Sequence, residues 1–499
     1  MLGNKATFGA IWLTAQTVTG RLVGIVANLV LAWYLTREDF GLFGTAATIA
    51  AFCEVFGAGG IGTILIVRQK NFDLWAGPAQ WLSAAFGIGV SVLMVASSVI
   101  AGAVTAIERD GELVGLVCVM ALVPFFRSLA TVPYSKLRIE MRFKRIAVIE
   151  TSVLLVSGLA KIVLAIAGFG AFSFVLPTAA FALIRTVVVW LAAGTKVDFA
   201  WRVRRWKYLM NDGLMLMLTA LTFKLVTYGD YAVLAFHVST KELGTYFFAF
   251  TYSILGVVML TSGLNGVLVP TFANLNDKPR QFLAFTRSAK LLLAIVCPLC
   301  FLQSAISEPA ARILLKPNWE PAIILLQVLS LGMAGRTVSW LAASLMESQG
   351  RFRTRMLIGL VSAAVFMVTV FIGVRVGGLL GTAIGVAIFY PIMSVFTTWV
   401  AISEIENPVQ TLREILFKPV VSAAFAVLLP WTAAKFFDVG VWGQFVLVPL
   451  AALLLYGLLL RYWMRETYIE LASKLSVVLK SLNFKKENAS SNSQVEASQ

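Results

Sequence analysis

Four cationic residues lie inside long apolar segments of this chain, far from the polar sequence that usually surrounds a charge. They are Arg21, Arg127, Lys224 and Arg336. A charged side chain within a membrane-spanning helix is costly and therefore usually serves a function. Guanidinium and ammonium groups donate charge-assisted hydrogen bonds to phosphate and carboxylate oxygens. These four positions therefore indicate an anion-binding site inside a membrane.

The four cations form two pairs that are related by repeated sequence. LAWYLT followed by DFG at residues 31–41 resembles LAFHVS followed by ELG at residues 234–244, and the same offset of 203 carries Arg21 to Lys224. RFK at residues 142–144 returns as RFR at residues 351–353, and that offset of 209 carries Arg127 to Arg336. Self-similarity at a nearly fixed distance indicates two related halves.

The composition places these cations in a polytopic membrane protein. Of 499 residues, 59% are hydrophobic and 13% are charged, whereas soluble domains are about one quarter charged. Apolar runs longer than eighteen residues are typical of membrane-spanning helices, so we expect an all-α fold without a cleavable signal peptide. Fourteen spans are predicted, at residues 8–35, 41–67, 78–105, 113–134, 146–168, 171–193, 208–236, 243–269, 285–306, 322–346, 356–376, 379–402, 415–437 and 441–464.

The loop charges predict the orientation of these spans. Of the 41 Lys and Arg residues, 28 fall on one side of the predicted membrane and seven on the other. The rich side is expected to be cytoplasmic, so both termini are predicted to be cytoplasmic. This topology accounts for most of the net charge of +16, and we therefore predict no nucleic-acid partner.

The repeat and the spans together predict the domain organisation. Residues 1–196 form an N-terminal lobe of spans one to six, and residues 197–406 form a C-terminal lobe of spans seven to twelve. Residues 407–482 add two further spans and a basic cytoplasmic segment, and residues 483–499 form a disordered cytoplasmic tail. Because six is an even number, the two pseudo-symmetric lobes have parallel topology and face each other across a central cleft.

Local signals predict how several of these spans begin and end. Gly168 and Gly170, and likewise Gly377 and Gly378, suit tight helical hairpins. Asp39 and Glu242 occupy matching corners, where helix capping is their expected role. ARILLK at residues 311–316 predicts a short interfacial helix, and Trp319 after it suits the headgroup region.

Three acidic residues within the spans leave two interpretations of the cations open. Glu54, Glu150 and Asp230 are candidates for pairing with the cations or for carrying a coupling proton. In the first interpretation each cation is held by one of these acids. In the second, the cations line a shared anion-binding cavity, since they outnumber the acids and continue polar stripes, as Arg127 does with Thr131 and Tyr134. No metal-ligand cluster, nucleotide-binding loop or catalytic triad stands out, so neither a metal nor another cofactor is predicted.

Four segments resemble the polysaccharide transporter family, the Wzx-type lipid-linked oligosaccharide flippases. They are LAWYLTREDFGLFGTAATIAAF, LRIEMRFKRIAVIE, LLKPNWEPAIILLQVLSL and ESQGRFRTR, between residues 31 and 355. The resemblance implies the fold of the multidrug, oligosaccharidyl-lipid and polysaccharide exporter superfamily, with two six-helix bundles around a central cleft. It also implies a polyprenyl diphosphate carrying an oligosaccharide as the substrate, moved across the bacterial inner membrane for exopolysaccharide, O-antigen, lipopolysaccharide or capsule synthesis.

The expected function is therefore a flippase in which Arg21, Arg127, Lys224 and Arg336 bind the diphosphate. Other polysaccharide assembly proteins are candidate partners. A drug or cation antiporter of the same superfamily is one alternative, although its cavity should be acidic or apolar. A membrane-embedded glycan polymerase or ligase is the enzyme alternative, but that class usually carries catalytic residues on a large outer loop, and no such loop is predicted here.

Overall fold

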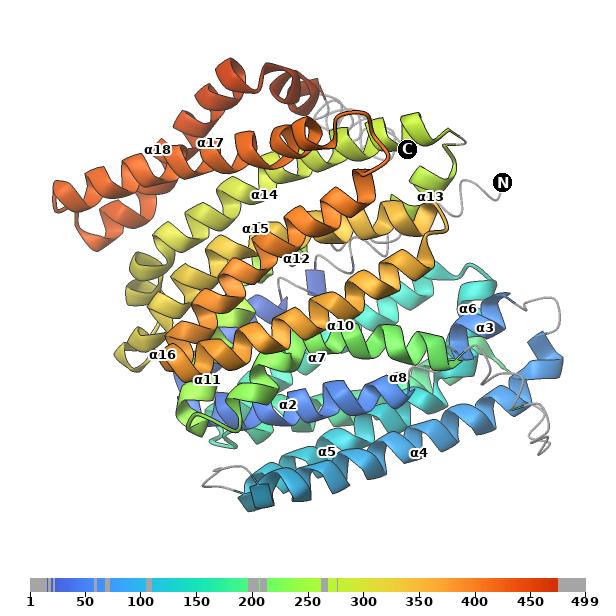
Figure 1. Cartoon of the computed structure of the whole chain (residues 1–499). Helices are drawn as coiled ribbons and strands as arrows, with labels where there is room; N and C mark the ends of the chain where they lie inside the picture. The colour runs from blue at the N-terminus through green and yellow to red at the C-terminus, as the bar shows by residue number, and fades with distance from the viewer. Residues whose placement is uncertain are drawn as a thin grey trace, which may run out of the picture.

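The computed structural model describes residues 16, 19–20, 23–57, 61–67, 72–104, 110–195, 206, 213–261, 268–275 and 277–473. Arg21, the first predicted cation, lies outside these residues. Every regular element within them is helical. The elements in Figure 1 are α2 (Arg37–Gly57), α3 (Ile61–Val67), α4 (Phe72–Val104), α5 (Asp110–Leu129), α6 (Thr131–Ile139), α7 (Phe143–Ile166), α8 (Phe172–Ala193), α10 (Gly213–Leu234), α11 (Thr240–Ser253), α12 (Leu255–Thr261), α13 (Leu268–Ala273), α14 (Lys278–Leu314), η3 (Pro317–Trp319), α15 (Glu320–Ser348), α16 (Phe352–Ile402), α17 (Pro408–Phe436) and α18 (Val441–Trp463).

The predicted all-α membrane architecture is confirmed. Within the described residues, 11 helices are long and apolar enough to cross a membrane. One of them, α16, has non-helical backbone at Gly377 and Gly378 and covers two predicted spans. The helix at Val23–Tyr34 and α10 lie where the first and seventh spans were predicted. The structure is thus compatible with fourteen spans.

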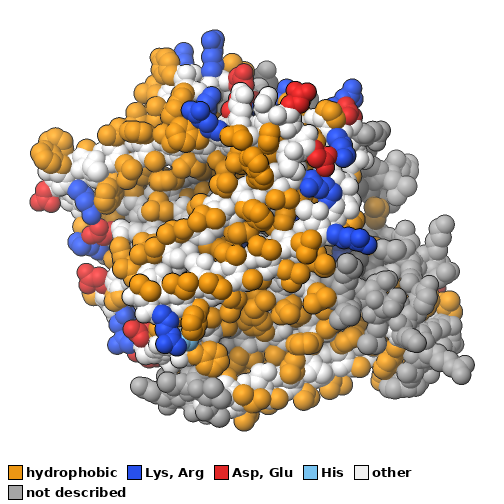
Figure 2. Space-filling model, in the orientation of Figure 1, with side chains coloured by type: hydrophobic (Ala, Val, Ile, Leu, Met, Phe, Trp, Pro, Cys, Tyr) orange, Lys and Arg blue, Asp and Glu red, His pale blue; other side chains and the backbone are white. Residues whose placement is uncertain are grey.

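The surface has the distribution of side chains that a bilayer requires. Figure 2 shows a broad face of hydrophobic side chains, with most of the Lys, Arg, Asp and Glu side chains near its edges. The highly exposed hydrophobic side chains of the protein include Val376, Leu454 and Leu191. Because these apolar side chains would be costly in water, their exposure indicates contact with lipid.

The helices fall into two groups that are joined chiefly through α2. In the N-terminal group, α5 packs on α4 and α8, and α8 packs on α7. In the C-terminal group, α15 packs on α14 and α16, and α16 packs on α10. Helix α2 contacts α10 and α11 of the second group, and α17 and α18 lie against α14, at the far side of the molecule from α4 (Figure 1).

Two glycines allow α2 and α11 to touch through their backbones. A Cβ atom on Gly41 would lie 1.9 Å from the carbonyl oxygen of Thr240, and one on Gly244 would lie 1.8 Å from that of Arg37. Gly41 and Gly244 are separated by 203 residues, and so are Arg37 and Thr240. Each glycine therefore faces the equivalent residue of the other helix. A contact that is reciprocal in this way is what a local twofold relation between the helices produces.

The corners that precede α2 and α11 are capped in the same manner. Asp39 Oδ2 accepts hydrogen bonds from the backbone N–H and hydroxyl of Thr36, each at 2.9 Å. Glu242 Oε2 accepts from the backbone N–H of Ser239 at 2.9 Å and from its hydroxyl at 2.8 Å, which completes a capping box. The capping roles predicted for Asp39 and Glu242 are confirmed.

The second repeat also has matching geometry. Arg142, before α7, has φ −80° and ψ 46°, and Arg351, before α16, has φ −79° and ψ 47°. Their Nη1 atoms donate to the carbonyl oxygens of Ala192 and Ala401 respectively, each at 3.4 Å. The two arginines are 209 residues apart, and so are the two alanines. Residues at this offset therefore share both their backbone conformation and a side-chain hydrogen bond.

The predicted glycine hairpins are present. Gly168 and Gly170 have φ values of 84° and 54° between α7 and α8, and Gly378 has a φ of 55° within α16. Residues with a Cβ atom rarely adopt this left-handed backbone, so glycine is suited to all three positions.

The prediction for the segment around Trp319 was wrong. ARILLK does not form a separate interfacial helix, because α14 runs on to Leu314 before the short η3 turn. Trp319 is 0% exposed rather than interfacial. Its ring packs on Phe40 of α2 and Phe248 of α11, and its Nε1 donates to the carbonyl oxygen of Ala32 at 2.9 Å. The indole therefore closes the junction between the two helix groups.

Candidate functional site

The carboxylate of Glu54 lies between two of the predicted cations. Glu54 on α2 is 3.5 Å from Arg127 Nη1 on α5 and 3.5 Å from Lys224 Nζ on α10. The side chains of Arg127, Glu54 and Lys224 are 63%, 37% and 22% exposed. This cluster thus joins the N-terminal group to the C-terminal group and leaves most of the Arg127 side chain accessible.

A cavity of about 480 Å³ opens beside this cluster, within the N-terminal group. The residues that line it come from α2, α3, α4, α5, α6 and α8 and the turns between them. They are Glu54, Gly57, Ile61, Gly62, Ser83, Phe86, Gly87, Val90, Pro124, Arg127, Ser128, Ala130, Thr131, Tyr134, Ser135, Arg138 and Arg185. The volume is within the range of about 300–1,000 Å³ that small-molecule sites usually occupy.

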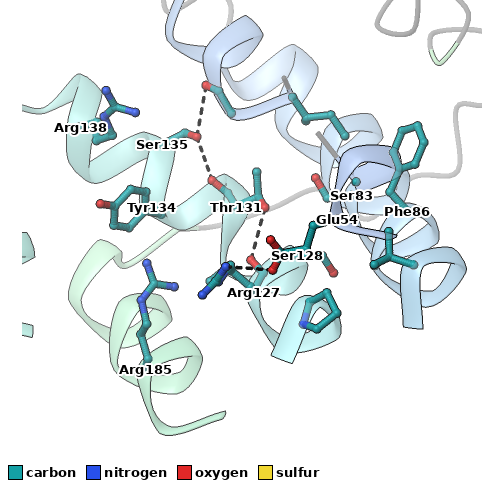
Figure 3. A pocket seen from close by; sticks show the side chains of 17 residues that line it. Glu54, Ser83, Phe86, Arg127, Ser128, Thr131, Tyr134, Ser135, Arg138 and Arg185 are labelled. Carbon is teal, nitrogen blue, oxygen red and sulfur yellow. Dashed lines mark hydrogen bonds and ion pairs between the residues drawn. The ribbon is translucent and has the colours of Figure 1, made fainter. Parts of the chain in front are cut away.

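The two ends of this cavity differ in chemistry. Figure 3 shows Arg138, Tyr134 and Arg185 at one end and Glu54, Ser83 and Phe86 at the other. The break at Ala130 lets the end of α5 and the short helix α6 both contribute to the wall. One end is therefore rich in guanidinium groups, while the other offers a carboxylate, a hydroxyl and an aromatic face.

At the guanidinium end, Arg185 is held by an acid and an aromatic ring. Its Nη2 and Nε atoms donate to Glu150 Oε1 at 2.6 Å and 2.9 Å. Its guanidinium lies 5.1 Å from the centre of the Tyr134 ring. Glu150 thus has the structural pairing role that was one of the two interpretations, and its partner is Arg185.

Arg336 has different surroundings from those of Arg127. Its Nη1 donates to the hydroxyl of Tyr390 at 3.0 Å, and the guanidinium lies 5.5 Å from the centre of that ring. Asp230, which is completely buried, interacts electrostatically with Arg336 and accepts a hydrogen bond from the Tyr246 hydroxyl at 2.9 Å. Arg336 therefore belongs to a polar network packed inside the C-terminal group.

The structure thus brings together only some of the predicted site residues. Arg127, Lys224 and Glu54 form one cluster, whereas Glu150 and Asp230 have partners elsewhere. The predicted stripe of Arg127, Thr131 and Tyr134 does line a cavity. Sequence reasoning missed Arg138, although it continues that stripe by one helical turn. Ser83 was also missed, because a single serine in an apolar span carries no signal of its own.

Comparison with known proteins agrees with this architecture. The family model described as "Polysaccharide biosynthesis protein" matches residues 30–324, which is more than half of the chain. The succinoglycan biosynthesis transport protein ExoT of Rhizobium meliloti (strain 1021) is 22% identical over 332 residues. That alignment covers 66% of this chain and 64% of the relative, so it spans a little less than two thirds of the relative's length.

Solved structures share the fold at low sequence identity. The lipid II flippase MurJ in its inward closed conformation has a TM-score of 0.72 at 14% identity, covering 91% of this chain and 99% of that one. An inward-facing multidrug resistance MATE family transporter of the MOP superfamily has a TM-score of 0.60 at 17% identity, with coverages of 79% and 96%. The chain belongs to the polysaccharide biosynthesis protein family and has the fold of a multi-pass membrane protein.

Proposed function

We propose that this protein is a flippase for polyprenyl-diphosphate-linked oligosaccharide repeat units. It moves them from the inner to the outer leaflet of the bacterial cytoplasmic membrane, for the synthesis of a surface polysaccharide such as an exopolysaccharide, O-antigen or capsule. Both termini are on the cytoplasmic side, and residues 1–196 and 197–406 form the two lobes. The observation that carries the proposal is the cluster of Arg127, Glu54 and Lys224 at the junction of two helix groups inside a transporter fold.

The chemistry of the cluster suits a diphosphate. In the empty protein Glu54 partly neutralises both cations, which lowers the cost of keeping them within the membrane. A diphosphate carries more negative charge than one carboxylate and accepts bidentate hydrogen bonds from arginine. It therefore competes with Glu54 for Arg127 and Lys224. Arg21 is proposed as a further ligand from its place in the repeat, whereas the packing of Arg336 on Tyr390 favours a structural role for that arginine.

Alternating access then follows from the position of Glu54. The carboxylate interacts with Arg127 of one helix group and Lys224 of the other, so displacing it removes an ionic link between them. The polyprenyl chain remains in lipid while the diphosphate and sugars occupy a hydrated cleft between the lobes. Rocking of the lobes exposes that cleft first to one leaflet and then to the other.

The relatives support the substrate class. One is named as a transport protein of succinoglycan biosynthesis and another as a flippase of lipid II. The experiment is deletion of the gene in the native host, followed by measurement of surface polysaccharides and of lipid-linked oligosaccharides. Loss of one polysaccharide, with accumulation of its lipid-linked precursor inside the cell, is the expected result. Increased drug sensitivity with normal polysaccharide would instead support the antiporter alternative.

A further inference from the structure

The cavity in the N-terminal group contains a buried hydroxyl with no bonding partner. Ser83 is 1% exposed, lines the cavity, and its Oγ has no hydrogen-bond partner among the described residues. Buried polar groups are nearly always hydrogen-bonded, because leaving one unpaired costs free energy. An orphaned hydroxyl in the wall of a cavity therefore indicates that a bound polar molecule completes its hydrogen bonding.

The neighbours of Ser83 favour a neutral, hydroxyl-rich ligand at this end. Glu54 accepts hydrogen bonds when ionised, so a sugar hydroxyl can donate to it once the diphosphate has taken its place beside Arg127 and Lys224. Phe86 offers an aromatic ring, and Ser128 offers a hydroxyl oxygen whose own proton is donated to the carbonyl of Phe125 at 2.7 Å. Hydrogen-bond acceptors, a free hydroxyl and an aromatic face match the alternating polar and apolar surface of a sugar ring.

The opposite end of the cavity favours an anion. Arg138 lies one residue before the end of α6, which places it near the side of the membrane predicted to be cytoplasmic. Its neighbour Arg185 is already paired with Glu150. Arg138 is therefore the residue at this end that suits contact with an incoming phosphate, close to the level of the lipid headgroups.

We propose that this cavity binds the sugar that is attached directly to the diphosphate of the lipid-linked substrate. Ser83 and Glu54 hydrogen-bond to the hydroxyls of that sugar, Phe86 packs on its ring, and Arg138 faces the diphosphate. The inference rests on the proposed function, since it assigns the place where that function's substrate is recognised. It makes the N-terminal group the part of the transporter that distinguishes sugars.

Binding measurements with two lipid probes test this assignment. The full-length protein is placed in lipid nanodiscs and titrated with sugar-free polyprenyl diphosphate and with lipid-linked oligosaccharide extracted from the deletion strain. Ser83→Ala is expected to weaken binding of the sugar-bearing probe roughly two- to tenfold, the usual effect of one hydrogen bond, and to leave the sugar-free probe unchanged. Arg138→Gln is expected to weaken both probes.

Two matched controls lie outside the cavity. Ser330 on α15 is 0% exposed and its Oγ also lacks a partner among the described residues, so Ser330→Ala removes an equivalent hydroxyl. Arg353 is an exposed arginine near the start of α16, so Arg353→Gln removes an equivalent charge. Neither control should change the affinity for either probe. Phe86→Leu provides a second variant at the sugar end should Ser83→Ala fold poorly.

The possible outcomes separate this inference from the proposed function. Unchanged binding of the sugar-bearing probe by both Ser83→Ala and Phe86→Leu overturns the sugar assignment. Equal weakening of both probes also overturns it, because the cavity would then hold the diphosphate. If the wild-type protein binds both probes equally well, the sugar adds nothing and the inference alone fails. If it binds neither probe, the proposed function fails and the inference with it.

Discussion

Arg127 and Arg336 are separated by the repeat distance of 209 residues, yet they lie in different environments. Arg127 borders an open cavity, its side chain is 63% exposed, and it approaches Glu54 from a neighbouring helix. Arg336 packs over Tyr390 and donates to its hydroxyl. A related position has thus retained its charge while its neighbours have changed, so related sequence does not imply equal function.

The residues around these arginines explain the difference. At an offset of 209, Tyr134 corresponds to Ala343 and Arg138 corresponds to Glu347. Glu347 lies 3.3 Å from Arg355. The C-terminal half therefore has an acidic residue in an ion pair at the position that Arg138 occupies in the N-terminal half. By contrast, the backbones at the corners and turns of the two halves agree closely. The halves share a framework, and the residues that suit ligand binding are concentrated in one of them.

The strongest effect is expected where the two halves are alike. Gly41→Ala and Gly244→Ala each place a Cβ atom within 2 Å of a backbone oxygen on the facing helix, at 1.9 Å and 1.8 Å. Because backbone cannot move aside easily, each change should lower the free energy of unfolding by about 3 kcal/mol or more. Thermal unfolding of the purified protein in detergent measures this.

The glycine pair has its own control. A Cβ atom on Gly89 of α4 meets nothing within 4 Å among the described residues, so Gly89→Ala should not lower the unfolding temperature and, because alanine favours a helix over glycine, should raise it slightly. Clearly unequal losses for Gly41→Ala and Gly244→Ala would contradict the reciprocal relation between the two corners.

A weaker but unequal effect is expected for the two arginines. Arg127→Ala should reduce polysaccharide export about 10- to 100-fold, as loss of a hydrogen bond to a charged group does, with little change in unfolding temperature. Arg336→Ala should mainly lower the unfolding temperature, because it leaves the buried Asp230 without a nearby cation. Export assays and protein levels in a complemented deletion strain distinguish these results, and Arg127→Lys should retain more export than Arg127→Ala.

Removing the charge of Glu54 tests the link between the groups. Glu54→Gln leaves Arg127 and Lys224 without their shared acid, and because these side chains are partly exposed, each lost contact should cost about 0.5–1 kcal/mol. The expected result is faster exchange between closed and open forms, measured as faster alkylation of a cysteine placed at Ser128. Unchanged alkylation would show that the carboxylate does not hold the groups together.

The smallest effect concerns acid pH at the turn before α17. Glu404 accepts a hydrogen bond from Lys278 at 2.8 Å and lies 3.7 Å from Arg351, and Lys278 chiefly lowers the pKa of Glu404 below its ordinary value of 4.5. A lowered pKa means that the stabilisation is present above pH 4.5 and is lost as the pH falls through the folded-state value.

The corresponding residue of the N-terminal half is Thr195, which cannot titrate in this way. The protection factor of the Glu404 turn, which is the intrinsic exchange rate at each pH divided by the observed rate, should therefore fall below pH 4.5, and the Glu404→Gln variant should lose that pH dependence. An equal fall in the protection factors of the wild type and the variant would contradict the assignment.

The sequence predicted those features that depend on local chemistry. Asp39 and Glu242 cap their helices because the distance to Thr36 and Ser239 is set by a single turn. The glycine hairpins follow from backbone conformations that glycine tolerates best. Hydropathy likewise predicted the all-α membrane architecture, since lipid requires long apolar helices.

Features that depend on tertiary packing could not be predicted in this way. The pairing of Arg185 with Glu150 and the position of Glu54 between two helices arise from how α2, α5, α7, α8 and α10 are arranged. Trp319 was expected at the headgroups because tryptophan is common there, and only the arrangement of α2 and α11 around η3 buries it. Ser83 acquires meaning only from the cavity beside it.

Parting the two helix groups at this junction would expose the buried Trp319. A buried tryptophan covers about 200 Å² of surface. Exposing even half of that area to water costs about 2.5 kcal/mol, which lowers the population of the open form roughly seventyfold. Under the proposed alternating access, the junction therefore remains closed in most molecules until substrate or an ion contributes binding energy. A flippase with such a resting state protects the membrane potential, because a junction that seldom opens while empty seldom leaks ions.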